Sequence, residues 1–221
     1  MPFTLAQLVR LRPFLAHVTR PDNLPSLRAD PVLRPAAELA RPDALPRTAP
    51  RPDAVPVRFN SRTVLLNDQK PLQLARMRFA PAGEWDAGRW LLHLDRRVFF
   101  WPLGPAGKPA AGALRHLTLY RKLGGVVFVL PTAAALDRRP AEFSGCNSGA
   151  TSRFAVAERG ADTLRPSDTF PKSAAGVVEV TVLGAVPLPE PWAEVAPGLI
   201  ACGPAARPGA AGLAAALYRT A

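Results

Sequence analysis

One glutamate lies in a setting that does not suit an ordinary surface carboxylate. Glu179 sits in the middle of the run VVEVTVL over residues 177–183, where most neighbours are valines. Burying a carboxylate is unfavourable unless the side chain faces a polar cleft or meets a partner. The pattern therefore makes Glu179 a candidate for chemistry, on a strand whose face lines a polar cleft. The alternative is a strand with one solvated face.

His17 and Thr19 form a second candidate group, at the end of the strand-like run FLAHVT over residues 14–19. Side chains two positions apart on a strand point to the same face. They could therefore present an imidazole and a hydroxyl to one ligand. The alternative is a hydrogen-bonded core histidine, followed by a threonine that caps the next helix.

Arg62 is the third candidate, because it follows the strand-like segment VPVRF and the turn residues Asn60 and Ser61. An arginine placed after a strand and a turn is well suited to grip a phosphate with two parallel hydrogen bonds. The alternative is a solvated surface arginine.

Several common catalytic motifs are missing from the sequence. It contains no GxxxxGK[ST] or GxGxxG nucleotide-binding loop, no HExxH zinc motif and no GxSxG nucleophile elbow. These absences argue against Walker-type or Rossmann nucleotide binding, zinc chemistry and serine hydrolysis. Cys146 and Cys202 have no metal-binding spacing, and we expect them to be reduced thiols in a cytoplasmic protein.

The elements that must position these residues predict an α+β fold, with a small mixed β-sheet core flanked by helices, in one domain over residues 1–221. Strands are expected at residues 14–19, 96–102, 124–131 and 176–189, and a further strand begins at residue 55. Helices are expected at residues 4–12, 21–28, 71–79, 84–95, 113–123 and 210–219. Leu5, Leu8 and Leu11 have helical spacing, and Trp85, Leu92 and Trp90 are expected to pack inward. Val178, Val180 and Val182 share one strand face, with Glu179 and Thr181 on the other. Long loops are expected at 29–54 and 144–176.

The charge balance indicates a polyanionic partner. The chain carries 28 basic and 17 acidic residues, a formal net charge of +11. Such a surface suits nucleic acid or a phosphate-rich cofactor. An arginine-rich composition inherited from GC-rich coding DNA is the alternative. No run of about 18 apolar residues is present, so we expect no membrane-spanning helix.

The three candidate segments, in their order and residue patterns, resemble the motifs of DarT-like ADP-ribosyltransferases, a family of nucleic-acid-modifying toxins. The matching segments are FLAHVT with NLPSL (14–19 and 23–27), VPVRFNSR (55–62) and VEVTV with the pair Val186–Pro187. The resemblance covers most of the chain in order. Two departures are Ala16, where many members have tyrosine, and the segment RRVFFWP, which lacks the histidine that often ends the family's middle strand.

The resemblance implies an ADP-ribosyltransferase-like fold and a role for each candidate. Glu179 would be the catalytic glutamate, Arg62 an arginine required for activity, and His17, Thr19 and Asn23 residues that hold NAD. The loop 144–176 would recognise the acceptor. NAD would be the substrate, no metal would be needed, and the acceptor would be a nucleobase in single-stranded DNA or RNA.

Other readings of the sequence stay open. The enzyme could modify a protein or a small molecule, or the chain could be a non-catalytic nucleic-acid-binding module. A nuclease is disfavoured because the sequence lacks a metal-binding acidic cluster. An antitoxin partner is also left open.

Overall fold

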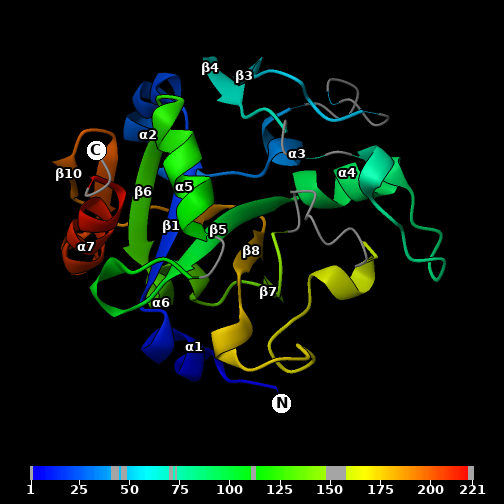
Figure 1. Ribbon diagram of the computed structural model, residues 1–221. Helices are drawn as coiled ribbons and strands as arrows, with labels where there is room; N and C mark the ends of the chain where they lie inside the picture. The colour runs from blue at the N-terminus through cyan, green and yellow to red at the C-terminus, as the bar shows by residue number, and fades with distance from the viewer. Residues whose placement is uncertain are drawn as a thin grey trace.

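A seven-stranded mixed sheet, in the order β10-β11-β6-β1-β5-β8-β7, runs through the computed structural model (Figure 1). Its strands are β1 (Phe14–Thr19), β5 (Arg97–Leu103), β6 (Val126–Pro131), β7 (Ala141–Ser144), β8 (Glu179–Leu183), β10 (Trp192–Ala196) and β11 (Leu199–Cys202). All neighbours are antiparallel except β11 and β6. The structure describes residues 2–40, 45, 49–69, 72, 74–110, 113–147 and 158–218.

Two short antiparallel pairs accompany the main sheet. Strand β2 (Val32–Leu33) pairs with β9 (Val186–Pro187), and β3 (Val55–Phe59) pairs with β4 (Arg62–Leu66). The β3–β4 hairpin turns at Asn60 and Ser61, which both have positive φ angles, of 47° and 64°. Two such residues in succession are typical of the tight turns that suit the twist of paired strands. The turn predicted at this place is confirmed, whereas β4 was not expected.

Helices cover both faces of the main sheet. They are α1 (Leu5–Leu11), α2 (Leu24–Ala29), α3 (Ala36–Leu39), α4 (Ala87–Asp95), α5 (Ala113–Lys122), α6 (Thr132–Leu136) and α7 (Arg207–Tyr218). Short 3₁₀ turns are η1 (Pro21–Asn23), η3 (Leu74–Arg76), η4 (Pro105–Gly107), η5 (Ala161–Thr163), η6 (Ala174–Gly176) and η7 (Pro204–Ala206). The predicted α+β class, with a mixed sheet flanked by helices, is therefore confirmed.

The sheet separates two apolar cores, and β6 contributes to both. Phe128 and Leu130 belong to one core, together with Leu8 of α1. Val127 and Val129 belong to the other, where α5 and α7 pack on the same face of the sheet. A strand buried on both faces reads as a continuous apolar run. This explains why GGVVFVLP was recognisable as a strand from its sequence.

The glycine- and alanine-rich tail forms α7, which packs very closely on η4. A Cβ atom at Gly212 would lie only 1.6 Å from the backbone oxygen of Ala106. A side chain there would force the two elements apart, so the absence of a Cβ is what allows the contact. Helix α7 begins at Arg207, earlier than the predicted start at residue 210.

Several expectations about the helices are wrong in detail. Helix α1 has the predicted Thr4 cap, but of its three leucines only Leu8 is buried, while Leu5 and Leu11 are 40% and 38% exposed. Helix α1 has only seven residues and lies on the surface, so a single side chain, that of Leu8, reaches the core. In the described part of 71–79 only Leu74–Arg76 is helical, as a 3₁₀ turn; residues 71 and 73 lie outside the described residues.

Helix α4 buries a different leucine from the one expected. Trp90, Leu91 and Leu94 are buried, whereas Leu92 and Trp85 are only partly so. Positions 90, 91 and 94 lie on one side of a helix with 3.6 residues per turn, and Leu92 falls outside that arc. Trp85 precedes the helix and meets Trp90 edge to face, with ring centroids 5.9 Å apart.

Candidate functional site

A cavity of about 260 Å³ lies where the central sheet divides. Residue pairing between β1 and β5 stops at Ala16 and Trp101. Beyond that point β1 continues along β6 to Thr19, while β5 pairs with β8 between Arg97 and Phe100. Residues of both separating strands line the cavity, as do residues of α2, α5 and the β3–β4 hairpin.

The cavity brings together every residue that the sequence singled out for the site. Its lining includes His17, Thr19, Asn23, Arg62 and Glu179. These residues come from β1, η1, β4 and β8, so they are distant in sequence and adjacent only in the fold. A carboxylate, an imidazole and a guanidinium around one cavity are a set of groups able to carry acid–base and electrostatic chemistry.

Glu179 is almost completely buried, with 2% of its surface exposed. It opens β8 and pairs with Ser144 of β7, whereas the sequence placed it in the middle of a strand. It lies next to the last residue pair between β5 and β8, Phe100–Val180, and lines the same cavity as Trp101 of β5. The predicted alternation along the strand is present, but Thr181 on Glu179's face is also fully buried. The alternative of a solvated strand face is therefore wrong.

His17 bridges the two strands at the point where they separate. Its Nδ1 atom lies 2.9 Å from the backbone oxygen of Phe99. A carbonyl oxygen only accepts, so Nδ1 carries the hydrogen and the neutral ring keeps Nε2 as an acceptor. Burial lowers the pKa of His17 to about 4, although the bond to Phe99 acts in the opposite direction. The imidazole is therefore neutral near pH 7, with one acceptor nitrogen.

Asn23 uses its side-chain amide to hold the β3–β4 hairpin in place. Its Nδ2 donates to Thr19 Oγ1 at 3.1 Å and to the Leu65 oxygen at 2.8 Å, and its Oδ1 accepts from the Leu65 nitrogen at 2.7 Å. Both amide hydrogens are thereby engaged. The structure gives Asn23 a positioning role toward the strand that Arg62 begins, and its predicted contact with NAD stays a prediction.

Substitution of Asn23 by aspartate should therefore destabilise the protein. Aspartate has the same shape but no amide hydrogens, so the partly buried Leu65 oxygen and the Thr19 hydroxyl lose their donor. The free energy of unfolding should fall by about 1–3 kcal/mol, the usual effect of leaving a buried polar group unsatisfied. Denaturant unfolding of the variant and the wild type measures this difference.

Ser26→Ala is the matched control, because the Ser26 hydroxyl also joins α2 to β4 but does so in an exposed bond to the Thr63 oxygen. This control should change the free energy of unfolding by less than about 0.5 kcal/mol. Equal effects of the two substitutions would contradict the role given to Asn23.

Arg62 is exposed at the rim of the cavity, as the first residue of β4. The turn at Asn60 and Ser61 sets its position, and the hydrogen bonds of Asn23 to the Leu65 backbone hold the hairpin. An exposed guanidinium on a fixed strand can meet a phosphate without first giving up a buried partner. The solvated-arginine alternative and the phosphate role are both compatible with this placement.

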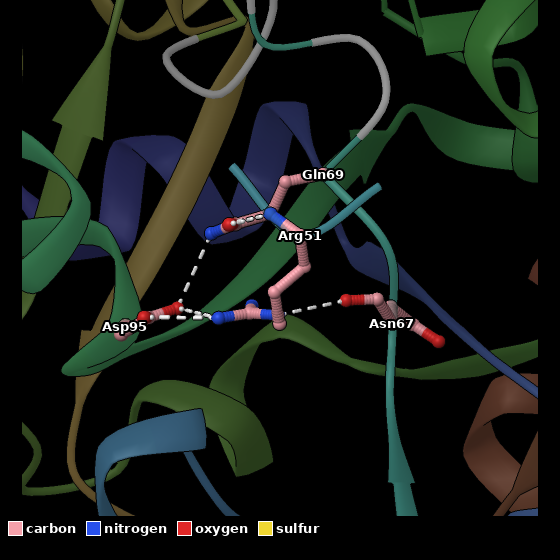
Figure 2. A network of polar contacts seen from close by, with 4 residues as sticks. All are labelled: Arg51, Asn67, Gln69 and Asp95. Atoms are coloured by element: carbon pink, nitrogen blue, oxygen red, sulfur yellow. Dashed lines mark hydrogen bonds and ion pairs between the residues drawn. The ribbon is translucent and has the colours of Figure 1, made fainter. Parts of the chain in front are cut away.

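A buried ion pair that was not expected from the sequence pattern also lines the cavity. Arg51 Nη1 lies 2.9 and 3.0 Å from the two carboxylate oxygens of Asp95, at the end of α4 (Figure 2). Arg51 Nε donates to the backbone oxygen of Asn67 at 3.2 Å, and Gln69 Nε2 donates to Asp95 Oδ1 at 3.3 Å. Burial raises the pKa of Asp95, and the charge and hydrogen bond of Arg51 oppose that rise. The network ties three segments into one cavity wall.

A second wall of the cavity is aromatic. His116 of α5 lies between Trp101 and Tyr120, with ring centroids 4.2 and 4.6 Å away. Burial lowers the pKa of His116 to about 4, so this ring too is neutral near pH 7. The Trp101 indole donates to Asn147 Oδ1 at 3.3 Å. Such a wall suits the stacking of flat rings.

The predicted recognition loop is described only in part. Residues 148–157 of the segment 144–176 lie outside the described residues, whereas Asn147 reaches the cavity. Within the part of the chain that the structure describes, no three His, Cys, Asp or Glu side chains are grouped so that they could hold a metal ion. Both cysteines are free thiols, as expected. Among the residues placed by the structure, no helix is long and apolar enough to cross a membrane.

Comparison with known proteins gives one match. A protein family described as a family of unknown function (DUF7002) matches residues 13–191 of the chain. That range includes all the cavity residues named above. No curated protein matches the chain, and neither does any solved structure.

Proposed function

The chain belongs to the DUF7002 family, whose function is unknown, and we propose that it is an NAD-dependent ADP-ribosyltransferase with an ADP-ribosyltransferase-like fold. Its acceptor in this proposal is a nucleobase in single-stranded DNA or RNA. One observation carries the proposal: His17, Thr19, Asn23, Arg62 and Glu179, chosen from separate stretches of sequence, line the same cavity.

The chemistry assigns a distinct task to the buried glutamate. The bond between nicotinamide nitrogen and ribose C1 breaks, nicotinamide leaves with the bonding pair, and positive charge develops on the ribose as in glycoside cleavage. The Glu179 carboxylate stabilises that charge and helps to remove the proton of the acceptor as its atom bonds to C1. A carboxylate that is almost completely buried acts in a medium where its field is weakly screened.

The remaining cavity residues suit the binding of NAD. The neutral His17 ring offers an acceptor nitrogen without adding positive charge, and the Thr19 hydroxyl lies two positions further along β1. Arg62 at the rim supplies the cation that a pyrophosphate or a nucleic-acid phosphate needs. The reaction requires no Lewis acid, so it can proceed with these side chains alone.

Replacing Arg62 by lysine should reduce activity nearly as much as replacing it by alanine. A lysine keeps the charge but cannot make two parallel hydrogen bonds in a fixed plane. Each variant should lose about 10- to 100-fold in kcat/KM for NAD, the range expected for charged hydrogen bonds. Nicotinamide release at varied NAD concentration is the measurement.

Arg58→Lys serves as the matched control for Arg62, because Arg58 is an exposed arginine of the same hairpin that does not line the cavity. It should retain wild-type activity. If lysine at position 62 works as well as arginine, Arg62 acts only as a general positive charge.

The acceptor can be identified with labelled NAD. Label should pass to single-stranded DNA or RNA and much less to duplex DNA, because unstacking a paired base costs a few kcal/mol. Affinity for a single strand should fall steeply with salt, with a slope in log–log form of about −0.7 for each phosphate contacted. The assay compares single strands, duplex, RNA and protein at two salt concentrations. Label on protein alone, or transfer that ignores salt, would favour the protein-modifying alternative.

A further inference from the structure

A second cavity, of about 400 Å³, lies on the other side of α2 from the first. Pro21, Leu24 and Arg28 line the second cavity, whereas Ser26 and Leu27 line the first. Helix α5 is shared in the same way, since Tyr120 faces the first cavity and Arg121 the second. The edge strand β10 and its neighbour β11 close the far wall with Trp192, Glu194 and Ile200. Figure 1 shows α2, α5, β6 and β10 together at this end of the sheet.

The second cavity contains two cationic side chains that lack an acidic partner. Within the described part of the chain, neither Arg28 nor Arg121 forms an ion pair. Arg28 is exposed at the mouth. Arg121 is partly buried, with its guanidinium carbon 4.5 Å from the centre of the Tyr218 ring. Tyr218 is itself fixed, because its hydroxyl donates to the Pro197 oxygen at 2.5 Å.

Two residues that line the second cavity each carry a buried donor atom with no hydrogen-bond partner among the residues that the structure places. These atoms are the Nε atom of Arg121 and the indole Nε1 atom of Trp192. A buried donor without an acceptor is rare and unfavourable, and a bound ligand is one way to satisfy it. The carboxylate in the wall, Glu194, accepts the Gly198 backbone N–H at 2.9 Å instead. The lining thus carries two guanidinium groups against one carboxylate, a net positive charge that suits an anionic ligand.

We propose that this second cavity binds a phosphate group of a single-stranded nucleic acid. Guanidinium groups and an indole N–H are all donors, and phosphate oxygens are only acceptors, so the two sets are complementary. The half-buried Trp192 ring adds an aromatic surface, which single-strand-binding sites combine with arginines. Because α2 and α5 line both cavities, one strand could place a base at the first and a phosphate at the second. The inference rests on the nucleic-acid part of the proposed function and not on the NAD chemistry.

Binding of a labelled single-stranded oligonucleotide, measured by fluorescence anisotropy without NAD, tests this inference. Arg28→Gln and Arg121→Gln should each weaken binding by about 3- to 10-fold and make the salt slope shallower by about 0.7. Trp192→Phe keeps an aromatic ring at this position but removes the indole N–H donor, and it should also weaken binding. Arg10→Gln is the matched control, an exposed arginine of α1 at the other end of β1; it should stay within about twofold of wild type.

The variants separate folding from binding. Arg121→Gln removes a contact with Tyr218, so its thermal unfolding is measured in parallel. Arg28 is exposed and makes no ion pair with any described residue, so Arg28→Gln should fold normally and its binding result stands alone. Equal affinities of Arg28→Gln, Arg121→Gln and Arg10→Gln would overturn the inference.

A titration with inorganic phosphate distinguishes the source of the ligand. Binding of inorganic phosphate that depends on Arg28 and Arg121, with oligonucleotide binding that does not, would identify a site for free phosphate and overturn the nucleic-acid assignment. Since NAD is absent from these assays, a failure of ADP-ribosyl transfer would leave a positive result intact. An unchanged affinity would likewise leave the transferase proposal untouched.

Discussion

Substitution of Glu179 by glutamine is expected to reduce ADP-ribosyl transfer by at least ~10²-fold, the usual effect of removing a group that stabilises transition-state charge. Glutamine preserves the size of the side chain and its capacity to hydrogen bond. What disappears is the negative charge opposite the ribose cation. Rates of nicotinamide release and of label transfer measure the effect on the chemistry.

The interpretation requires that the Glu179→Gln protein folds, since Glu179 is buried and interacts with its surroundings. Its melting temperature and far-ultraviolet circular dichroism should therefore be compared with those of wild type. Glu190→Gln removes the same charge at an exposed position and should keep full activity. A folded Glu179→Gln protein with near-normal transfer would exclude the catalytic role.

The position of the cavity follows from how the sheet divides. In a continuous sheet, β1 and β5 would stay paired along their length, and their side chains would fill the cores above and below. Here their pairing stops at Ala16 and Trp101. Beyond that pair, the His17 imidazole is hydrogen-bonded to the backbone oxygen of Phe99. Side chains from opposite faces of the sheet can thereby reach one space between the strands.

Four of the interior strands were predictable because burial on both faces leaves a strong composition signal. The runs that became β1, β5, β6 and β8 are rich in β-branched and aromatic residues. Strands β11, β10 and β7 were not predicted. Strand β11 is buried but has only four residues, β10 lies at the edge of the sheet with no buried residue, and β7 also has only four residues. Sequence periodicity needs more residues, or a clearer contrast between faces, to identify such elements.

The same reasoning explains which site residues could be found. Glu179 and His17 were recognisable because each interrupts an apolar strand, so their types conflict with their surroundings. Arg51 lies in a proline-rich segment among many other arginines, and its partner Asp95 is 44 residues away. Nothing local distinguishes such a residue from a solvated one. Only the fold shows that both members of the pair are buried.

Removal of the Asp95 carboxylate is expected to be the most damaging change to stability among those considered. Arg51 and Asp95 are 5% exposed, so Asp95→Ala leaves a guanidinium buried without its counter-charge. Breaking one side of a buried pair commonly lowers the free energy of unfolding by about 3–5 kcal/mol. Denaturant unfolding should show this loss. Activity should fall as well, because the segment that carries Asn67 and Gln69 is then no longer anchored at the cavity wall.

Two comparisons show whether burial is the cause. Asp162→Ala breaks an ion pair with Arg165 in which the carboxylate is 83% exposed, and the change should be worth no more than about 1 kcal/mol. The double variant Arg51→Met/Asp95→Leu replaces both charges with apolar groups and should recover much of the stability lost in Asp95→Ala, because neither charge remains unpaired. It should not recover activity to the same extent, since the bonds of Arg51 to the Asn67 oxygen and of Gln69 to Asp95 are gone. If Asp95→Ala costs no more than Asp162→Ala, the network of Figure 2 does not hold the cavity wall together.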